Sequence, residues 1–503
     1  MLASIATFAL EGVDSREVTV EVDVRPGLPV FTVVGLPDAA VREARERVRA
    51  ALLNSGFEFP LQRLTANLAP AHVRKAGPSF DLALAVALLA ASRQLPPERL
   101  ESCAVCGELS LGGELRPVHG AVAVAVGARA AGYRRLIVPS ENAAEAALVD
   151  GIEVLGAPSL ERLVDLVAGR WTPPAPAVRA QRDRSREIWP DLDEVHGQSD
   201  ARRALEIAAA GGHNLLMIGP PGAGKTMLAR RLPGILPPPS FEEALEITRV
   251  HSVAGISDGT LAQERPFRAP HHTISPSGLV GGGSTPRPGE ITLAHRGVLF
   301  LDELAEFSRP ALEALRQPLE EGVVKVTRGQ RSLVFPAATM LIAACNSCPC
   351  GRPPSDCMCD GKDRMRYHRR LSGPLVDRID LVCQLDASPQ LEVARGRPES
   401  SAAVRERVLA ARELQLARFA GAGIHANAEM DARLTDKHVR LPADAMRRLL
   451  SGNTNAPLSA RSHDRVLRLA RTIADLDGRP KVRLSDVDEA LGYKLNFPLA
   501  VAA

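Results

Sequence analysis

Aromatic side chains and lysine are both scarce in this sequence. Phe, Trp and Tyr make up 3% of its 503 residues, so aliphatic residues must supply most of any hydrophobic core. Arginine supplies most of the basic residues, and lysine occurs only at positions 75, 225, 325, 362, 437, 481 and 494. Arginine clusters are therefore weak evidence for nucleic-acid binding here, whereas an isolated lysine is informative. The net charge of +3 is too small to indicate a partner.

Long apolar runs are also missing, and none is long enough to span a bilayer. The first 24 residues carry charges that do not suit a secretory signal, at Glu11, Asp14, Arg16, Glu17 and Glu21. We therefore expect a cytoplasmic protein without a membrane partner. Five of the eight cysteines fall between positions 345 and 359. In a cytosolic protein such clustering favours a metal site over disulfides.

The length predicts about three domains. Residues 1–169 alternate apolar β-type runs with helical patterns and predict an α/β or α+β domain. Its strands are expected at Val18–Val24, Val30–Val34 and Arg135–Pro139, and its helices at Ala39–Asn54 and Asp81–Ala91. Residues 170–192 combine proline and charge without periodicity, which is typical of a linker.

The remaining two thirds of the chain divide into an α/β part and a helical part. Residues 193–392 show short buried strands, helices and long glycine-rich loops, so we expect an α/β core there. Residues 393–503 are predicted to form a helical lid. Its helices are expected near 401–420, 443–451, 459–476 and 485–492.

A phosphate-binding loop is the strongest motif. Residues 214–226 form an apolar strand that runs into G-x-x-x-x-G-K-T. Backbone N–H groups of such a loop wrap phosphates, and the helix that follows presents its N-terminus to their charge. Lys225 is expected to reach the β- and γ-phosphates of ATP, and Thr226 to ligate Mg²⁺. A chance glycine-rich turn would lack the flanking strand and helix. The expected nucleotide contacts are Gly219, Pro220, Pro221, Gly222, Ala223, Gly224, Lys225 and Thr226.

Two more apolar strands end in polar residues. Residues 297–303 form a strand that ends in Asp302, placed to hold Mg²⁺ through water, and Glu303, placed to polarise the attacking water. The alternative is that these acids only cap a helix. Residues 339–345 form another strand, and Asn346 after it can orient the lytic water. Together with the phosphate loop, these motifs match the AAA+ ATPases and predict ATP hydrolysis.

Arginines further along the chain are candidates to act on the same chemistry. Arg378 is the candidate arginine finger, which acts on the nucleotide of a neighbouring subunit. The alternative is a surface salt bridge to Asp377 or Asp380. Arg461 is the candidate sensor 2 residue that closes over the nucleotide, with Arg465 as the competing choice.

Longer motifs carry a resemblance to a known family. They are R-A-P-H-H-T-I-S at 268–275, the glycines at 281–283, P-G-E-I at 288–291 and G-P-L-V-D-R-I-D at 373–380. The chain resembles, over nearly its whole length, the magnesium-chelatase-like ComM/YifB family of AAA+ ATPases. This resemblance implies a homohexameric ring, related to magnesium chelatase subunits and to replicative helicases.

The resemblance also implies a function on DNA. Characterised ComM proteins are branch-migration motors that extend heteroduplex during natural transformation, so ATP, Mg²⁺ and DNA are the expected ligands. The motif spacing alone predicts only an ATPase. The alternative is a chelatase-type ATPase that remodels a protein or a metal-insertion complex. The N-terminal domain is expected to recognise DNA or a partner.

Two segments are candidates for the pore of the ring. Residues 264–288 resemble the helix-2 insert of this clade. Residues 323–336 predict a hairpin from which Lys325, Arg328 and Arg331 project towards DNA. The alternative is an ordinary solvated hairpin. His271 and His272 should not chelate a metal together, because neighbours in an extended segment face opposite ways.

The cysteine cluster predicts structural zinc. Cys348, Cys350, Cys357 and Cys359 form C-x-C-x₆-C-x-C, and two short knuckles can supply the four thiolates of tetrahedral zinc. Cys345 is a spare candidate, and free or redox thiols are the alternative. Cys103 and Cys106 have no second pair nearby, so we expect them to be buried thiols.

The N-terminal domain resembles Lon-type Ser–Lys proteases, which share the ribosomal S5 domain 2-type fold. The resemblance rests on residues 77–79 (G-P-S), 107–120 and 138–142. That chemistry needs a lysine to deprotonate the serine, yet no lysine occurs between Lys75 and Lys225. We therefore expect a Lon-like fold without proteolysis, and a Ser79 that caps the helix beginning near Asp81.

Overall fold

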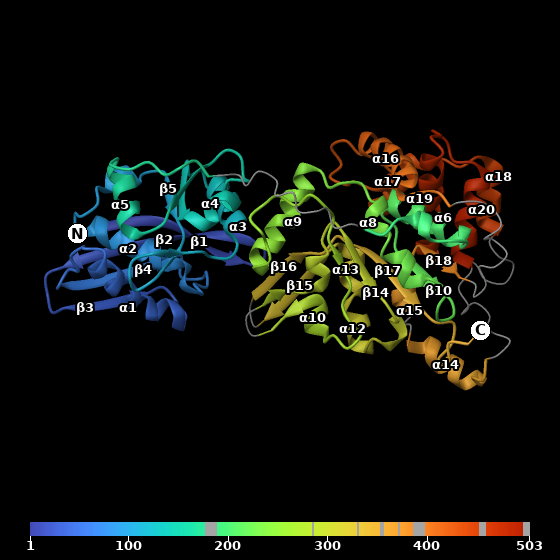
Figure 1. Cartoon of the computed structure of the whole chain (residues 1–503), viewed down its shortest axis with the longest axis horizontal. Coiled ribbons are helices and arrows are strands. Elements are labelled where there is room, and N and C mark those ends of the chain that lie inside the picture. The colour runs from blue at the N-terminus through green and yellow to red at the C-terminus, as the bar shows by residue number, and fades with distance from the viewer. Residues whose placement is uncertain are drawn as a thin grey trace. The chain divides into compact units, whose positions relative to one another are not determined.

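The computed structural model describes residues 1–176, 189–283, 286–328, 331–352, 357–370, 373–385, 398–451 and 459–495. The chain forms two compact units (Figure 1). Unit 1 consists of residues 1–184, 241–262 and 327–335, and unit 2 consists of residues 185–240, 263–326 and 336–503. No helix in the described part of the chain has the length and apolar character needed to cross a membrane.

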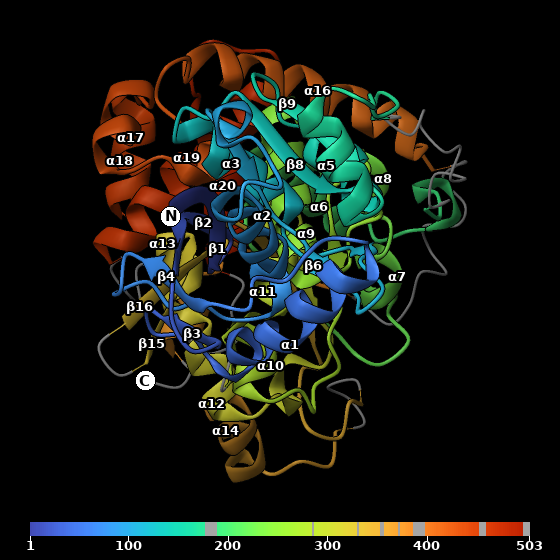
Figure 2. The same cartoon turned by 90° about the vertical axis from the view of Figure 1, so that its left-hand side faces the viewer.

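Unit 1 is built on a mixed seven-stranded sheet with the order β3-β4-β2-β1-β5-β8-β9. Figure 2 labels β1, β2, β3, β4, β8 and β9 of this sheet. β1 and β4 pair with β2 in antiparallel fashion, and the other neighbours are parallel. The strands are β1 (Leu2–Glu11), β2 (Asp14–Arg25), β3 (Val30–Val34), β4 (Arg63–Ala69), β5 (Cys103–Val105), β8 (Arg135–Pro139) and β9 (Glu153–Ala157). The predicted strands in this region are confirmed, and β2 is longer than expected.

Helices cover both faces of this sheet. Side chains along β1 point alternately to the two faces of the sheet. Ile5 and Ala9 belong to a buried cluster shared with the helices at residues 39–54 and 81–91, whereas Ala6 and Phe8 belong to a second cluster shared with the helix at residues 121–130. The helices are α1 (Ala39–Asn54), α2 (Asp81–Ala91), α3 (Ala121–Ala130), α4 (Ser140–Ala146) and α5 (Leu160–Ala168), and a small ribbon pairs β6 (Glu108–Leu109) with β7 (Leu115–Arg116). The bounds predicted for α1 and α2 are confirmed.

The start of α2 corrects one prediction. Ser79 lies in a 3₁₀ turn (Pro78–Phe80) that leads directly into α2, and within residues 77–92 no side chain caps either element. The carbonyl of Gly107 accepts from the backbone N–H of Leu82 at 3.2 Å. That carbonyl satisfies a donor of the first helical turn, so the prediction that Ser79 caps the helix is wrong.

Two segments from later in the chain also belong to unit 1. In α9 (Phe241–Ala254), the carbonyl of Ser252 accepts from Gly120 N–H at 3.1 Å at the start of α3. In the segment 327–335, the carbonyl of Val334 faces the β1–β2 turn. A Cβ on Gly12, whose φ is +70°, would lie 3.0 Å from that oxygen. Unit 1 is therefore not a continuous stretch of chain.

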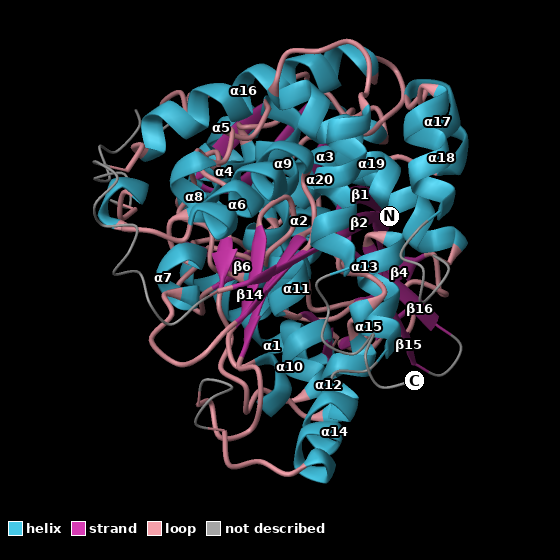
Figure 3. Ribbon diagram, turned by 90° about the vertical axis from the view of Figure 1, so that its right-hand side faces the viewer, coloured by secondary structure: helices cyan, strands magenta, loops and turns pink. Residues whose placement is uncertain are grey.

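Unit 2 contains a parallel five-stranded sheet with the order β11-β14-β17-β10-β18, of which Figure 3 labels β14. Its strands are β10 (Leu215–Ile218), β11 (Phe267–Arg268), β14 (Val298–Leu301), β17 (Met340–Cys345) and β18 (Leu381–Gln384). β10, β14 and β17 are buried along their whole length. Helices on both faces of a parallel sheet produce such continuous apolar strands, and the α/β class predicted for this region is confirmed.

Short helices and ribbons connect these strands. They are α6 (Ser199–Gly211), α7 (Lys225–Ala229), α8 (Leu232–Ile235), α10 (Pro276–Val280), α11 (Glu290–Leu293), α12 (Arg309–Ala314), α13 (Arg316–Glu321), α14 (Gly361–Arg370) and α15 (Gly373–Val376), with one ribbon of β12 (Gly281–Gly282) and β13 (Arg287–Pro288). A separate ribbon pairs β15 (Val323–Arg328) with β16 (Arg331–Pro336), and its residues 327–335 belong to unit 1. The predicted hairpin at 323–336 is therefore present.

The C-terminal helices share one hydrophobic core with the sheet. Leu215 and Ile342 from strands belong to the same buried cluster as Val408, Ile473 and Leu491 from these helices. The helices are α16 (Ser401–Arg418), α17 (Ala432–His438), α18 (Ala443–Ser451), α19 (Ala460–Leu476) and α20 (Leu484–Leu495). Four were predicted. The short α17 was missed because seven residues give too little periodicity to detect.

Candidate ATP-hydrolysis site

The phosphate loop follows β10 and leads into α7, as its motif predicts. Gly222 and Gly224 adopt φ values of +80° and +91°, which glycine reaches without strain. The Lys225 side chain is held inside the loop. Its Nζ donates to the carbonyls of Gly219 at 2.7 Å and Pro220 at 2.9 Å. Burial lowers the pKa of Lys225, and the acidic groups nearby oppose that effect.

The predicted magnesium ligands lie together. β14 runs beside β17 in the sheet, and Asp302 directly follows Leu301, the last residue of β14. The Thr226 hydroxyl donates to the Asp302 carboxylate, with Oγ1 and Oδ2 2.7 Å apart. A hydroxyl and a carboxylate are oxygen ligands of the kind Mg²⁺ takes beside nucleotide phosphates. The residues present therefore fit a magnesium–ATP complex, in which the ion would neutralise charge on the phosphates.

Asn346 completes this cluster. β17 ends at Cys345, which is paired in register with Ile218 at the end of β10, so Asn346 emerges at the same edge as the phosphate loop. The Lys225 Nζ lies 3.1 Å from its Oδ1. The structure thus brings Lys225, Thr226, Asp302 and Asn346 together.

The candidate arginines lie at the opposite edge of the sheet. Arg378 precedes β18, and its carbonyl accepts from Asn214 Nδ2 at 2.9 Å, just before β10 begins. The phosphate loop begins at the other end of β10. The four extended residues of that strand separate its two ends by about 13 Å. The Arg378 guanidinium pairs with Glu320 instead, so Arg378 does not reach the phosphate loop of its own chain.

Arg461 belongs to the same opposite-edge cluster. Its guanidinium lies 3.2 Å from the other oxygen of Glu320. Arg461 is therefore not placed over the phosphate loop of its own chain, which corrects the expectation that it closes over that nucleotide. Arg465 pairs with the buried Asp380 at 3.3 Å. Burial raises the pKa of Asp380, but the nearby His213 and the Arg465 charge outweigh it and lower that pKa to about 2.

Glu303 has a partner that the sequence did not suggest. The His272 Nδ1 lies 3.3 Å from the Glu303 Oε2. The rings of His271 and His272 lie against each other, with centroids 4.1 Å apart and planes tilted by 34°. The expectation that these rings face opposite ways is wrong because residues 271–274 form a turn, in which Ile274 N–H donates to the His271 carbonyl at 3.0 Å.

The four predicted zinc ligands converge. The sulfurs of Cys348, Cys350, Cys357 and Cys359 all lie within 4.8 Å of one another. Three of the separations are 3.3, 3.6 and 3.7 Å, close to the ~3.8 Å between thiolates on tetrahedral zinc. Cys345 is buried apart from this group, and burial raises its pKa to about 12.

The cysteine loop touches the phosphate loop. Gly351 lies between the cysteine pairs with a φ of +67°, and a Cβ there would lie 2.8 Å from Cγ of Pro221. Gly351 therefore packs closely against the loop that is predicted to bind phosphate.

The hairpin residues are only partly described. The Lys325 side chain is exposed, and its Nζ lies 2.7 Å from Oε2 of Glu321. The side chains of Arg328 and Arg331, and residues 329–330 at the turn, lie outside the described residues. The prediction that these three basic residues contact DNA stays a prediction.

In the described part of unit 1, no lysine follows Gly120, where the catalytic lysine of a Ser–Lys protease is expected. Residues 121–126 of α3 are A-V-A-V-A-V, and the buried Lys75 donates to the Pro70 carbonyl. Cys103 and Cys106 are buried as expected, which raises their pKa values to about 11 and about 12.

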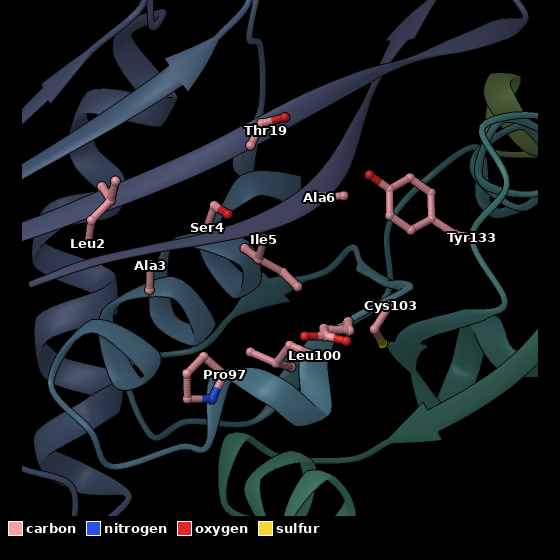
Figure 4. A pocket seen from close by; sticks show the side chains of 11 residues that line it. Leu2, Ala3, Ser4, Ile5, Ala6, Thr19, Pro97, Leu100, Cys103 and Tyr133 are labelled. Carbon is pink, nitrogen blue, oxygen red and sulfur yellow. The ribbon is translucent and has the colours of Figure 1, made fainter.

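A pocket of about 420 Å³ opens beside β1 (Figure 4). Its polar lining includes Ser4, Thr19, Glu101 and Tyr133, and the Tyr133 hydroxyl donates to Glu17 at 2.6 Å. This pocket belongs to unit 1 and shares no residue with the nucleotide site.

Comparisons with known proteins agree with this site. Three family profiles match the chain: "Magnesium chelatase, subunit ChlI" at residues 191–393, "Subunit ChlI of Mg-chelatase" at 20–142 and "Magnesium chelatase, subunit ChlI C-terminal" at 398–494. The phosphate loop, both acids and Asn346 fall within the first. The fold and the site therefore define a magnesium-chelatase-like AAA+ protein, a class for which ATP and Mg²⁺ are the implied ligands.

Relatives narrow the family further. An uncharacterized protein of Mycobacterium tuberculosis is 45% identical, with 97% of each chain covered. The competence protein ComM of Haemophilus influenzae is 43% identical, and the uncharacterized protein YifB of Escherichia coli 42%, each with 98% of this chain and 97% of the relative covered. The chain belongs to the magnesium-chelatase-like ComM/YifB family. Lon protease 2 of Thermus thermophilus is 34% identical over 130 residues, which is 24% of this chain.

Proposed function

We propose that this protein is an ATP-driven DNA motor that works as a homohexameric ring and moves branched DNA junctions. One observation carries the ring: the phosphate loop with its acids lies at one edge of the sheet, and Arg378 with Arg461 lies at the other. An ATP site that needs a charge-stabilising arginine is complete only where two copies meet. The ring then has one such site at each subunit contact.

The geometry supports the following roles in hydrolysis. Thr226 and Asp302 would hold Mg²⁺, which supplies charge neutralisation on the phosphates. Lys225 binds the phosphates electrostatically. Asn346 orients the attacking water, and Glu303 accepts a proton from it. Arg378 and Arg461 of the next subunit would stabilise the charge that develops on the transferred phosphoryl group.

DNA is the proposed substrate because of the relative named as a competence protein and because of the basic hairpin. Lys325 is one of seven lysines in the chain and is exposed on β15. With Arg328 and Arg331 it would contact the phosphate backbone inside the ring. Unit 1 would guide DNA or a partner protein to that channel.

A synthetic three-way or four-way junction tests this proposal. We expect ATP-dependent branch migration, measured by separation of labelled products on a native gel, and ATP turnover that rises when junction DNA is added. A Lys225→Ala protein is the control, since it keeps the hairpin but loses phosphate binding. Absence of migration, together with turnover that is indifferent to DNA, would refute the DNA motor.

The alternative is an ATPase that remodels a protein or a metal-insertion complex. The observation in its favour is that all three matching family profiles are named after a magnesium chelatase subunit. Under this alternative, DNA changes neither turnover nor assembly, and the junction assay distinguishes the two functions.

We also propose that the four clustered cysteines bind one structural zinc ion. Their sulfur separations support this proposal. Bound zinc would crosslink the four cysteines, and the close approach of Gly351 to Pro221 would let that crosslink support the phosphate loop.

Protein purified without chelators should contain about one zinc ion per chain. Cys348→Ser should remove most of that zinc, lower the melting temperature and raise the KM for ATP, because the loop that supports Pro221 loses its crosslink. Zinc is measured by elemental analysis. Cys383→Ser is the matched control, because Cys383 is buried in β18 away from the cluster, and it should keep full zinc. Zinc-free wild-type protein, or a fully loaded Cys348→Ser protein, would contradict the assignment.

A further inference from the structure

The segment that carries Arg378 is attached to the beginning of β10. Asn214 directly precedes β10, and its side-chain amide donates from Nδ2 to the Arg378 carbonyl at 2.9 Å. The Asn214 backbone binds the residues that follow. Its N–H donates to Asp380 Oδ2 at 3.1 Å, and its carbonyl accepts from the N–H groups of Asp380 and Leu381, each at 3.0 Å. The side chain and the backbone of one residue therefore both hold the segment 378–381.

The same amide also binds a second strand. Asn214 Oδ1 accepts from the backbone N–H of Leu341, in β17, at 2.8 Å. In the sheet, β17 lies on one side of β10 and β18 lies on the other. An asparagine suits this position because its amide offers a donor and an acceptor in one plane. A carboxylate of the same shape would keep the acceptor for Leu341 and lose the donor to Arg378.

Two basic residues of the C-terminal helices bind the same segment. Lys494, in α20, donates from Nζ to the Ile379 carbonyl at 3.0 Å. Arg465, in α19, pairs with the buried Asp380 at 3.3 Å. Lys494 is one of only seven lysines in the chain, and the hydrolysis site does not use it. The backbone at residues 378–380 is therefore held by the sheet and by the C-terminal helices together.

The side chain of Arg378 ends in a different kind of contact. Its guanidinium pairs with Glu320, whose other oxygen lies near Arg461, and the Glu320 side chain is 43% exposed. An ion pair that reaches the solvent is weak, so the guanidinium can exchange Glu320 for a phosphate while its backbone stays in place. The fixed backbone then defines the point from which the guanidinium reaches out.

We propose that Asn214 is a positioning residue for Arg378, fixing the backbone from which this arginine reaches the ATP of the neighbouring subunit. This inference rests on the proposed ring, in which Arg378 acts between subunits. β10 begins directly after Asn214 and leads into the phosphate loop at its other end. The two ends of this one strand therefore serve two different ATP sites.

Asn214→Asp should lower the kcat for ATP hydrolysis about 10- to 100-fold, because displacing a reacting group by about 1 Å costs up to about 10²-fold. The aspartate keeps an acceptor for Leu341 and loses the donor to Arg378. The KM for ATP should stay within about twofold, since the phosphate loop is unchanged. The measurement is the rate of phosphate release at several ATP concentrations. A kcat within twofold of wild type overturns the proposal.

Thr339→Val is the matched control. Thr339 directly precedes β17 at the same edge of the sheet, and its hydroxyl donates to the Gly297 carbonyl at 3.2 Å. This bond also joins neighbouring parts of the sheet, but it does not touch the segment 378–381. The variant should keep kcat within about twofold of wild type. A loss as large as that of Asn214→Asp would assign the effect to the sheet edge in general and overturn the role of Asn214.

Mixed rings show on which subunit the defect acts. Asn214→Asp has an intact phosphate loop and Lys225→Ala has an intact Arg378, so turnover of their mixture should exceed the sum of the separate activities. A mixture of Asn214→Asp with Arg378→Ala should show no such gain, because neither protein offers a well-placed arginine. A defect passed through β10 to the phosphate loop of the same subunit would give the opposite pattern, which overturns the proposal.

Lys494→Met is a second variant that loosens the same segment from α20. It should lower kcat less than Asn214→Asp and give the same pattern in mixed rings. If Asn214→Asp fails to assemble in size-exclusion chromatography, a wild-type kcat in Lys494→Met overturns the proposal instead.

The inference and the proposed function fail in different ways. If Lys225→Ala and Arg378→Ala restore no turnover although they enter one ring, the ATP site shared between subunits is refuted, and the role of Asn214 with it. If that pair restores turnover but Lys225→Ala does not rescue Asn214→Asp, the shared site stands and only the role of Asn214 is refuted.

Discussion

Replacing Glu303 with glutamine should lower the kcat for ATP hydrolysis by about 10²–10⁴-fold, the range measured for loss of a general base. ATP binding should persist, because Lys225, Thr226 and the loop glycines make the phosphate contacts and remain intact. Glutamine keeps the size of the side chain and removes its ability to accept a proton. Turnover is measured as the rate of phosphate release, and ATP binding is measured with a fluorescent ATP analogue.

Glu306→Gln is the matched control for this variant. Glu306 lies three residues further on and pairs with Arg370 at 3.2 Å, outside the phosphate site. Its loss should leave kcat within about twofold of wild type, as for most surface charges. Wild-type turnover in Glu303→Gln would remove Glu303 from the mechanism, and loss of ATP binding would assign it a structural role instead.

Replacing Arg378 with alanine should lower kcat by about 10³-fold or more, the effect of losing an arginine finger. The reason lies in the two edges of the parallel sheet. Arg378 precedes β18 and cannot reach the phosphate loop that follows β10 in the same chain. Under the proposed function, its guanidinium would exchange Glu320 for the nucleotide of another copy.

Mixing two inactive proteins tests this geometry. Lys225→Ala supplies an intact Arg378, and Arg378→Ala supplies an intact phosphate loop, so mixed rings should regain part of the wild-type turnover. Arg309→Ala, which alters an arginine with 79% of its side chain exposed on α12, is the control and should stay active by itself. If mixing restores nothing although both proteins enter one ring, Arg378 does not act between subunits.

The sequence predicted elements best where one signal was unambiguous. α1 has an amphipathic pattern after the capping residue Asp38, and α2 is apolar on every side, so their bounds were found correctly. The predicted helix cap at Ser79 is wrong because a carbonyl 28 residues away, that of Gly107, accepts from the backbone N–H of Leu82 instead. Such contacts arise only when the sheet has formed, and no local pattern encodes them.

The site likewise contains residues that local sequence patterns reveal and contacts that only tertiary packing creates. Lys225, Thr226, Asp302 and Asn346 were found because each follows an apolar strand, and parallel strands deliver their ends to one edge. The contact of His272 with Glu303 was not found, because it depends on the offset between β11 and β14 and on a turn that looked extended in sequence. The position of Arg461 beside Glu320 likewise depends on tertiary packing.

The division of the chain between the two units bears on how this protein can be cut. The backbone passes from one unit to the other at 184/185, 240/241, 262/263, 326/327 and 335/336. A protease that cleaved once between residues 170 and 192 would therefore not release the N-terminal piece, because α9 and the segment 327–335 would still be packed within it. For the same reason, a gene could not lose or exchange this domain by a single break at the linker and leave a well-packed ATPase behind.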